Sequence, residues 1–203
     1  MDAFYSFVEL EDSLKQANTI RHIGNVYFYL DQFEPAQYFF TLVSDYGKAL
    51  DDTSLIISGL NSTAAVYGNT SRMDSALILF KEAHALAREY GSLQQEILAY
   101  YNMGDVHLFS GRRTQALEVF HDLENYYDLK KNSPKHLSNL YNSMTKAYLE
   151  KQVFVNARAY SQKAHQALME NMRYTEYKEY YLNLYRIDSS ENQIERALEH
   201  YIR

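Results

Sequence analysis

Turn-forming and reactive residues are scarce in this chain. Its 203 residues include two proline, seven glycine, no cysteine and no tryptophan. Glycine and proline make up about 4% of the chain, against roughly 12% in average proteins, which argues against β-sandwich and βαβ folds, because these need such residues at many corners. The absence of cysteine excludes a disulfide scaffold, a thiolate metal site and a cysteine nucleophile.

Positive charge and long apolar runs are also lacking. The net charge of −6 disfavours a nucleic-acid or anionic-membrane surface. No apolar run approaches the roughly 18 residues of a transmembrane helix, and the acidic N-terminus lacks the basic segment of a signal peptide. We therefore expect a soluble chain with no membrane insertion and no direct nucleic-acid partner. The cytoplasm is the simplest location, and the extracytoplasmic part of a membrane-bound sensor stays open.

An internal repeat of about 40 residues runs through the chain. One alanine recurs at this spacing, at Ala36, Ala76, Ala116, Ala157 and Ala197. A phenylalanine follows the first three alanines by four residues, at Phe40, Phe80 and Phe120. An aromatic or histidine precedes the first four by nine, at Tyr27, Tyr67, His107 and Tyr148. Register and residue type therefore recur together, as they do in repeat proteins.

These residues resemble the tetratricopeptide repeat, and the resemblance covers nearly the whole chain. The chain departs from the family pattern in lacking the signature tryptophan and the closing proline, and its period exceeds the common 34 residues. The resemblance implies an all-α fold, a right-handed superhelical α-solenoid of antiparallel helix pairs. The long period is similar to that of bacterial sensor and regulator arrays.

Hydrophobic periodicity supports the same fold independently. Ile20, Ile23, Gly24 and Tyr27 follow the i, i+3, i+4, i+7 pattern of an amphipathic helix, and one helix pair cannot bury both its faces without a stacked neighbour. We predict the helix pairs 13–30 with 33–48, 53–69 with 72–90, 92–110 with 113–128, 133–151 with 153–170, and 174–188 with 191–202. Gly47 falls inside a predicted helix and should cost about 1 kcal/mol relative to alanine.

These pairs are predicted to form one solenoid domain over residues 1–203. Its repeats span about 13–50, 53–91, 92–131, 133–171 and 174–203, and residues 1–8 are expected to be the remnant helix of a preceding repeat. The fifth repeat has the weakest pattern, because Asp188 stands where an aromatic is expected.

No catalytic constellation is visible in the sequence. It contains no phosphate-binding glycine loop, no nucleophile elbow and no zinc-protease motif. The seven histidines are scattered through the repeats. We therefore predict no enzymatic activity, no metal site and no cofactor.

A concave groove is the binding surface that the family resemblance implies. Its positions on the first helix of each repeat map to Asn18, Arg21, Asn25, Phe28, Asn61, Ala65, Leu98, Tyr101, Asp105, Asn139, Asn142 and Lys146. An asparagine amide offers both a donor and an acceptor to a peptide main chain. The resulting prediction is a module that binds a protein or peptide as the sensory or regulatory part of a larger signalling protein.

Two alternatives stay open. The asparagines are also compatible with ordinary polar residues on a hydrated helix face. The chain is equally compatible with an architectural scaffold that self-associates through its convex face or its terminal helices, where Leu198, Tyr201 and Ile202 are expected to be exposed.

Overall fold

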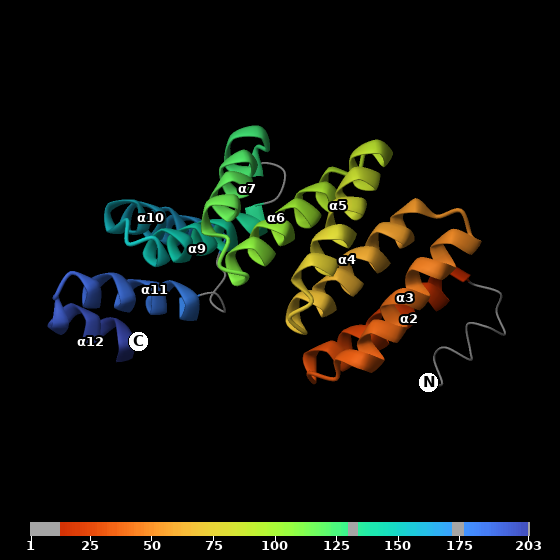
Figure 1. Cartoon of the computed structure of the whole chain (residues 1–203), viewed down its shortest axis with the longest axis horizontal. Helices are drawn as coiled ribbons and strands as arrows, with labels where there is room; N and C mark the ends of the chain where they lie inside the picture. Colours follow the sequence, from red (N-terminus) through yellow and green to blue (C-terminus); the bar gives the residue numbers. More distant parts are fainter. Residues whose placement is uncertain (1–12, 130–133, 172–176, 203) are drawn as a thin grey trace. The chain divides into compact units, whose positions relative to one another are not determined.

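The computed structural model describes residues 13–129, 134–171 and 177–202. These residues form ten helices and no strand (Figure 1), so the predicted all-α class is confirmed. The helices are α2 (Ser13–Tyr29), α3 (Phe33–Ala49), α4 (Thr53–Asn69), α5 (Met73–Tyr90), α6 (Leu93–Phe109), α7 (Arg113–Tyr126), α9 (Pro134–Glu150), α10 (Phe154–Asn171), α11 (Tyr177–Ser190) and α12 (Ile194–Ile202). The predicted helix over residues 1–8 lies outside the described residues.

Consecutive helices pack against each other, as expected for stacked helix pairs. The chain divides into two compact units, unit 1 (Met1–Val106) and unit 2 (His107–Arg203), and helix α6 spans the boundary. In unit 1, α2 packs on α3, α3 on α4, and α4 on α5. In unit 2, α9 packs on α10, α10 on α11, and α11 on α12. The first helices of adjacent pairs also touch, α2 with α4 and α9 with α11.

Almost every described turn between helices closes in the same way. One residue adopts positive φ, and the N–H of the next residue donates to a carbonyl five residues back, as in a Schellman motif. The positive-φ residues are Asp31, Asp51, Ser71, Gly91, Gly111, Gln152 and Asn192. Five of these seven are not glycine, which explains how so helical a chain manages with so few glycines.

The repeating alanines and phenylalanines form the core. Ala36, Ala76 and Ala116 are fully buried, and Phe80 and Phe120 are at most 2% exposed. Ala76 and Phe80 of α5 pack with residues of α6 in one apolar cluster. The periodic residues therefore fill the contacts between successive helices, which is what their register predicts.

Gly47, which is awkward in the sequence, lies at a close contact between α3 and α4. A β-carbon at Gly47 would lie 2.6 Å from the backbone nitrogen of Ile56. Across the same contact, a β-carbon at Gly59 would lie 2.6 Å from the backbone nitrogen of Ser44. Close packing of these two helices therefore offsets the unfavourable helix propensity of glycine.

Candidate peptide-binding surface

The predicted groove residues all lie on the first helices of the repeats. Asn18, Arg21, Asn25 and Phe28 are on α2, and Asn61 and Ala65 are on α4. Leu98, Tyr101 and Asp105 are on α6, and Asn139, Asn142 and Lys146 are on α9. Because α2 touches α4 and α9 touches α11, neighbouring first helices form a continuous face within each unit. We call this the first-helix face.

Three asparagines occupy one register position on this face. Asn61 on α4, Asn142 on α9 and Asn183 on α11 are 7%, 8% and 2% exposed. The side-chain oxygen Oδ1 of each is buried and has no hydrogen-bond partner within the described residues. Asn183 Nδ2 donates to the main-chain oxygen of Asn142 at 3.4 Å. The amides therefore lie at the base of the face, where neighbouring first helices meet.

Asn183 is absent from the predicted groove, although the sequence carried a signal for it. It follows Asn142 by 41 residues, the spacing that separates Ala116 from Ala157. The unusual Asp188 made the fifth repeat look irregular and hid this correspondence. The structure places Asn183 on α11, which packs on α9.

The predicted groove residues of α2 are largely engaged within their own repeat. Asn18 Nδ2 donates to the carbonyl of Leu14 at 3.1 Å, and an Arg21 guanidinium nitrogen donates to Asn18 Oδ1 at 3.3 Å. The Phe28 ring lies 5.8 Å from Phe33 and 6.3 Å from Phe40, between ring centroids. These contacts make Phe28 part of the packing of the first repeat.

The remaining predicted residues are partly accessible. Ala65 packs at the edge of the apolar cluster around Phe80. The others in this group are half-buried, namely Asn25, Leu98, Tyr101, Asp105 and Asn139. They can contact a ligand without any movement of the helices.

Lys146 on α9 has an aromatic partner. Its Nζ lies 4.3 Å from the centroid of the Phe109 ring, at the end of α6. Phe109 is 66% exposed, so the cation and the ring both reach the surface. Such a cation–π pair holds the ammonium group in one place. Phe109 was not among the predicted residues.

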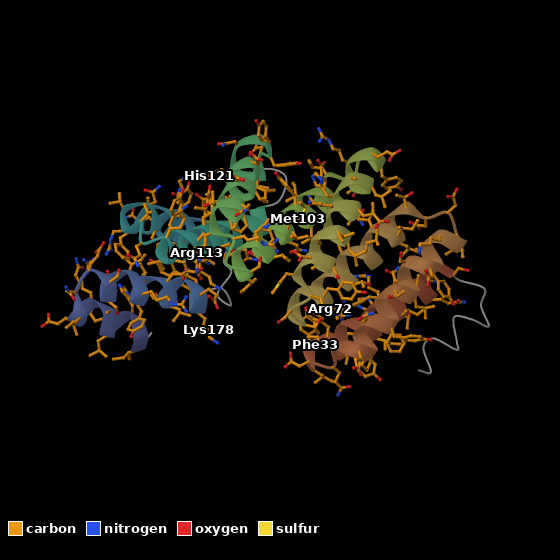
Figure 2. The ribbon with its side chains drawn as sticks, in the orientation of Figure 1. Phe33, Arg72, Met103, Arg113, His121 and Lys178 are labelled. Carbon is orange, nitrogen blue, oxygen red and sulfur yellow. The ribbon has the colours of Figure 1, made fainter. Side chains whose placement is uncertain are left out.

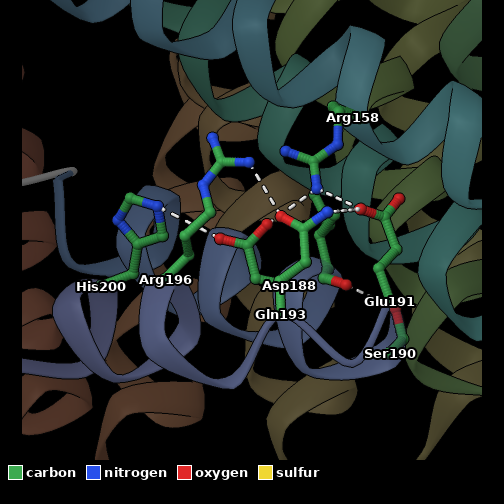
Figure 3. Close-up of polar contacts among 8 residues, drawn as sticks. Arg158, Asp188, Ser190, Glu191, Gln193, Arg196 and His200 are labelled. Carbon is green, nitrogen blue, oxygen red and sulfur yellow. Dashed lines mark hydrogen bonds and ion pairs between the residues drawn. The ribbon is translucent and has the colours of Figure 1, made fainter.

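A buried ion-pair cluster fixes the helix that carries Asn183 (Figure 3). Asp188 on α11 is fully buried and accepts a hydrogen bond from Arg158 on α10 at 2.7 Å. Arg158 also donates to Glu191, and His200 Nε2 on α12 lies 3.3 Å from Asp188 Oδ2. Burial lowers the pKa of Arg158, but its hydrogen bonds to Asp188 and Glu191 outweigh this and leave the pKa raised. Asp188 thus ties α11 to both neighbouring helices.

A second polar network connects α7, α9 and α10 in unit 2. Glu124 accepts hydrogen bonds from the Tyr160 hydroxyl at 2.9 Å and from Lys163 at 2.6 Å. Burial and the Glu124 carboxylate raise the pKa of Tyr141 to about 12. His121, which lies on α7 (Figure 2), is 2.8 Å from the Tyr148 hydroxyl through Nε2. These groups satisfy one another, so the network joins helices and leaves no free acid or base for catalysis.

The described residues hold few features of an enzyme. A cavity of about 240 Å³ is lined by Leu137, Tyr141, Lys163, Gln166, Ala167 and Glu170. Gln166 donates to Glu170 across one turn of α10. Within the described part of the chain, no group of three His, Asp or Glu side chains is placed to hold a metal ion. The described helices also include none that is long and apolar enough to cross a membrane.

Comparison with solved structures identifies similar folds. The chain matches BtubC (BKLC) from P. vanneervenii with a TM-score of 0.79 at 15% identity, covering 98% of this chain and 84% of that chain. It matches the Rap conjugation gene regulator of plasmid pLS20, in complex with the Phr* peptide, with a TM-score of 0.76 at 16% identity, covering 98% and 60%. It matches the MamA RS-1 ArsTM double mutant with a TM-score of 0.59 at 18% identity, covering 94% and 92%.

The chain has an all-helical repeat fold. No family model matches its sequence, and no curated protein matches it at significant similarity. At identities of 15–18%, the likeness to these structures shows the fold alone. The tetratricopeptide pattern therefore stays a resemblance carried by the periodic alanines and aromatics.

Proposed function

We propose that this chain is a non-catalytic module that binds an extended peptide or protein segment on its first-helix face. The observation that carries the proposal is the register of Asn61, Asn142 and Asn183, each with an unpaired buried Oδ1. A buried acceptor without a donor costs about 1–3 kcal/mol. Its recurrence at one position of three repeats calls for a physical reason, and the N–H groups of a bound peptide would supply the missing donors.

The asparagine side chains can adapt to such a ligand. Their last torsion has a broad energy profile, so rotation exchanges the amide oxygen and nitrogen between the helix contact and the surface. An extended peptide presents alternating N–H and C=O groups along each edge, and an amide can pair with either. This recognition depends on the main chain, and it leaves sequence preference to side-chain contacts elsewhere on the face.

The regulator of plasmid pLS20 supports this proposal by analogy. That protein was solved in complex with a peptide, and this chain spans 60% of its length with a TM-score of 0.76. A module of this kind would serve as the sensory or regulatory part of a larger signalling protein. We place its partner among proteins or peptides.

Selection of peptides from a random displayed library on the immobilised chain tests the proposal. We expect selected peptides to slow amide hydrogen exchange in the first helices, and Asn142→Ala to weaken their binding at least fivefold in fluorescence anisotropy. Asn156→Ala is the matched control, because Asn156 lies on the second helix α10. Equal losses in both variants, or protection confined to the second helices, would contradict the proposal.

Self-association is a second candidate function, and one observation favours it. Ile194, Leu198 and Ile202 lie four residues apart along α12 and are 75%, 57% and 75% exposed. The side chain of Tyr201 lies outside the described residues. If this stripe joins copies of the chain, Leu198→Glu combined with Ile202→Glu will convert an oligomer into a monomer in sedimentation velocity. A wild-type chain that is monomeric at 100 μM, a concentration on the order of a weak interface's Kd, would exclude this role.

A further inference from the structure

We propose that Lys146 and Phe109 form a subsite for a carboxylate of the bound peptide. This inference rests on the proposed function, and it specifies the chemical class of the ligand, a peptide that carries an acidic group. The two residues come from adjacent repeats of unit 2, Phe109 from the end of α6 and Lys146 from α9. Both lie beside the asparagine register on the first-helix face.

The first observation is the unusual environment of Lys146. Among the lysines whose side-chain exposure the structure describes, it alone is half-buried, and the others are exposed. Its Nζ is held 4.3 Å from the Phe109 ring centroid. Partial burial removes water from the ammonium group, and an aromatic ring replaces only part of that stabilisation. The position therefore favours an added negative charge.

The second observation is the missing counter-charge. No carboxylate of the described residues lies within 4.0 Å of Lys146 Nζ. Other basic side chains of unit 2 have such partners: Lys163 pairs with Glu124 at 2.6 Å, and Arg113 pairs with Glu150 at 2.7 Å. Lys146 is thus a positioned cation that the described part of the protein leaves without an anion.

The distribution of charge along the chain favours an acidic ligand at this place. Although the whole chain carries −6, fourteen of its 20 lysine and arginine residues fall within unit 2. An acidic peptide would therefore approach unit 2 with less long-range repulsion than the net charge suggests. The exposed Phe109 ring adds apolar area beside the cation, which suits the methylene groups of an acidic side chain.

The carboxylate can come from an acidic side chain or from a chain end, and small probes distinguish these sources. N-acetyl-aspartate N-methylamide presents a side-chain carboxylate, and N-acetyl-alanine presents a main-chain carboxylate. N-acetyl-asparagine N-methylamide is the neutral control of matched shape. Each is titrated into the isotope-labelled full chain, and the signals of the Lys146 side chain and the Phe109 ring are followed by NMR.

We expect at least one acidic probe to shift both signals in a saturable way, with a dissociation constant on the order of 1–10 mM, typical of one exposed ionic contact. The probe that binds identifies the source of the carboxylate. Lys146→Met should weaken this binding at least tenfold. Lys178→Met should leave it unchanged, since Lys178 is an exposed lysine of the same unit.

Three results would overturn the inference: equal shifts from the neutral probe, no saturable shift from either acidic probe, or unchanged binding in Lys146→Met. The outcome is separable from that of the proposed function. Peptides that bind the first-helix face equally well with and without Lys146 would leave the proposed function in place and remove the subsite. Acidic probes that bind at Lys146 when library selection yields no peptide would do the reverse.

Discussion

The buried carboxylate of Asp188 offers a sharp test of how the last repeat is held together. Asp188 occupies the register position of Tyr27, Tyr67, His107 and Tyr148, yet it is fully buried and bonded to Arg158. The perturbation is Asp188→Ala, which removes the carboxylate and leaves the guanidinium in place. We expect α11 and α12 to detach from α10 more readily.

The expected cost follows from the geometry. Breaking a buried ion pair by removing one partner costs about 3–5 kcal/mol. The Arg158 side chain is 29% exposed and keeps its contact with Glu191, so part of the penalty is relieved by water and by the second carboxylate. We therefore expect a loss of about 2–3 kcal/mol in the free energy of opening of α11 and α12.

Native-state hydrogen exchange measured on peptides covering residues 177–202 is the appropriate assay, because it reports local opening separately from global unfolding. Glu191→Ala is the matched control. Its side chain is 29% exposed and shares the same arginine, so its loss should cost less than about 1 kcal/mol. The double variant Arg158→Met with Asp188→Leu removes both charges and should recover at least about 1 kcal/mol relative to Asp188→Ala.

The reasoning would be refuted if Asp188→Ala cost no more than Glu191→Ala. It would also fail if the double variant were less stable than Asp188→Ala alone. In either case the ion pair would be incidental to packing of the last repeat, and the buried position of Asp188 would have another cause.

Three further predictions concern packing, turns and pH. Gly59→Ala should lower the free energy of unfolding by about 1–3 kcal/mol in urea denaturation, because its β-carbon would lie 2.6 Å from the Ser44 backbone. Gly68→Ala, whose β-carbon would make an ordinary 3.7 Å contact, should raise it by about 0.5–1 kcal/mol, and similar losses at both sites would contradict this. Gln152→Gly should stabilise by about 0.5–1 kcal/mol in the same assay, since Gln152 has a φ of 59°, and a destabilised variant would show that its side chain contributes more than the strain costs. Burial lowers the pKa of His84 below 6.5, so its contribution to stability is complete above that pH and is lost as the pH falls. The melting temperature should therefore drop less between pH 7.5 and 5.5 in His84→Gln than in the wild type, and an equal drop would count against this account.

Much of the fold follows from local patterns in the sequence. The recurrence of Ala36, Ala76 and Ala116 with their following phenylalanines predicts which faces of which helices are buried, and the structure confirms that these residues fill the contacts. Helix ends were predicted to within a few residues, with α7 ending at Tyr126, two residues before the expected position. These features depend on spacing along one or two helices, which a single sequence displays.

The contacts between helices could not be predicted in this way. Gly47 appeared unfavourable, because helix propensity is a local quantity and the partner across the contact, the backbone of Ile56, is nine residues away. Asp188 looked like a defect of the repeat, because its partner Arg158 lies on another helix, 30 residues earlier. Both residues make sense only when the opposing surface is known.

The candidate surface divides in the same manner. The sequence by itself determined the all-helical repeat, the register of its core and the helices that carry Asn61, Asn142 and Lys146. Only the tertiary structure decided that the asparagine oxygens are buried and unpaired, that Asn183 continues their register, and that Lys146 rests on Phe109. Periodicity specifies which face of a helix a residue occupies, whereas burial, pairing and charge balance depend on side chains that other helices bring to the same place.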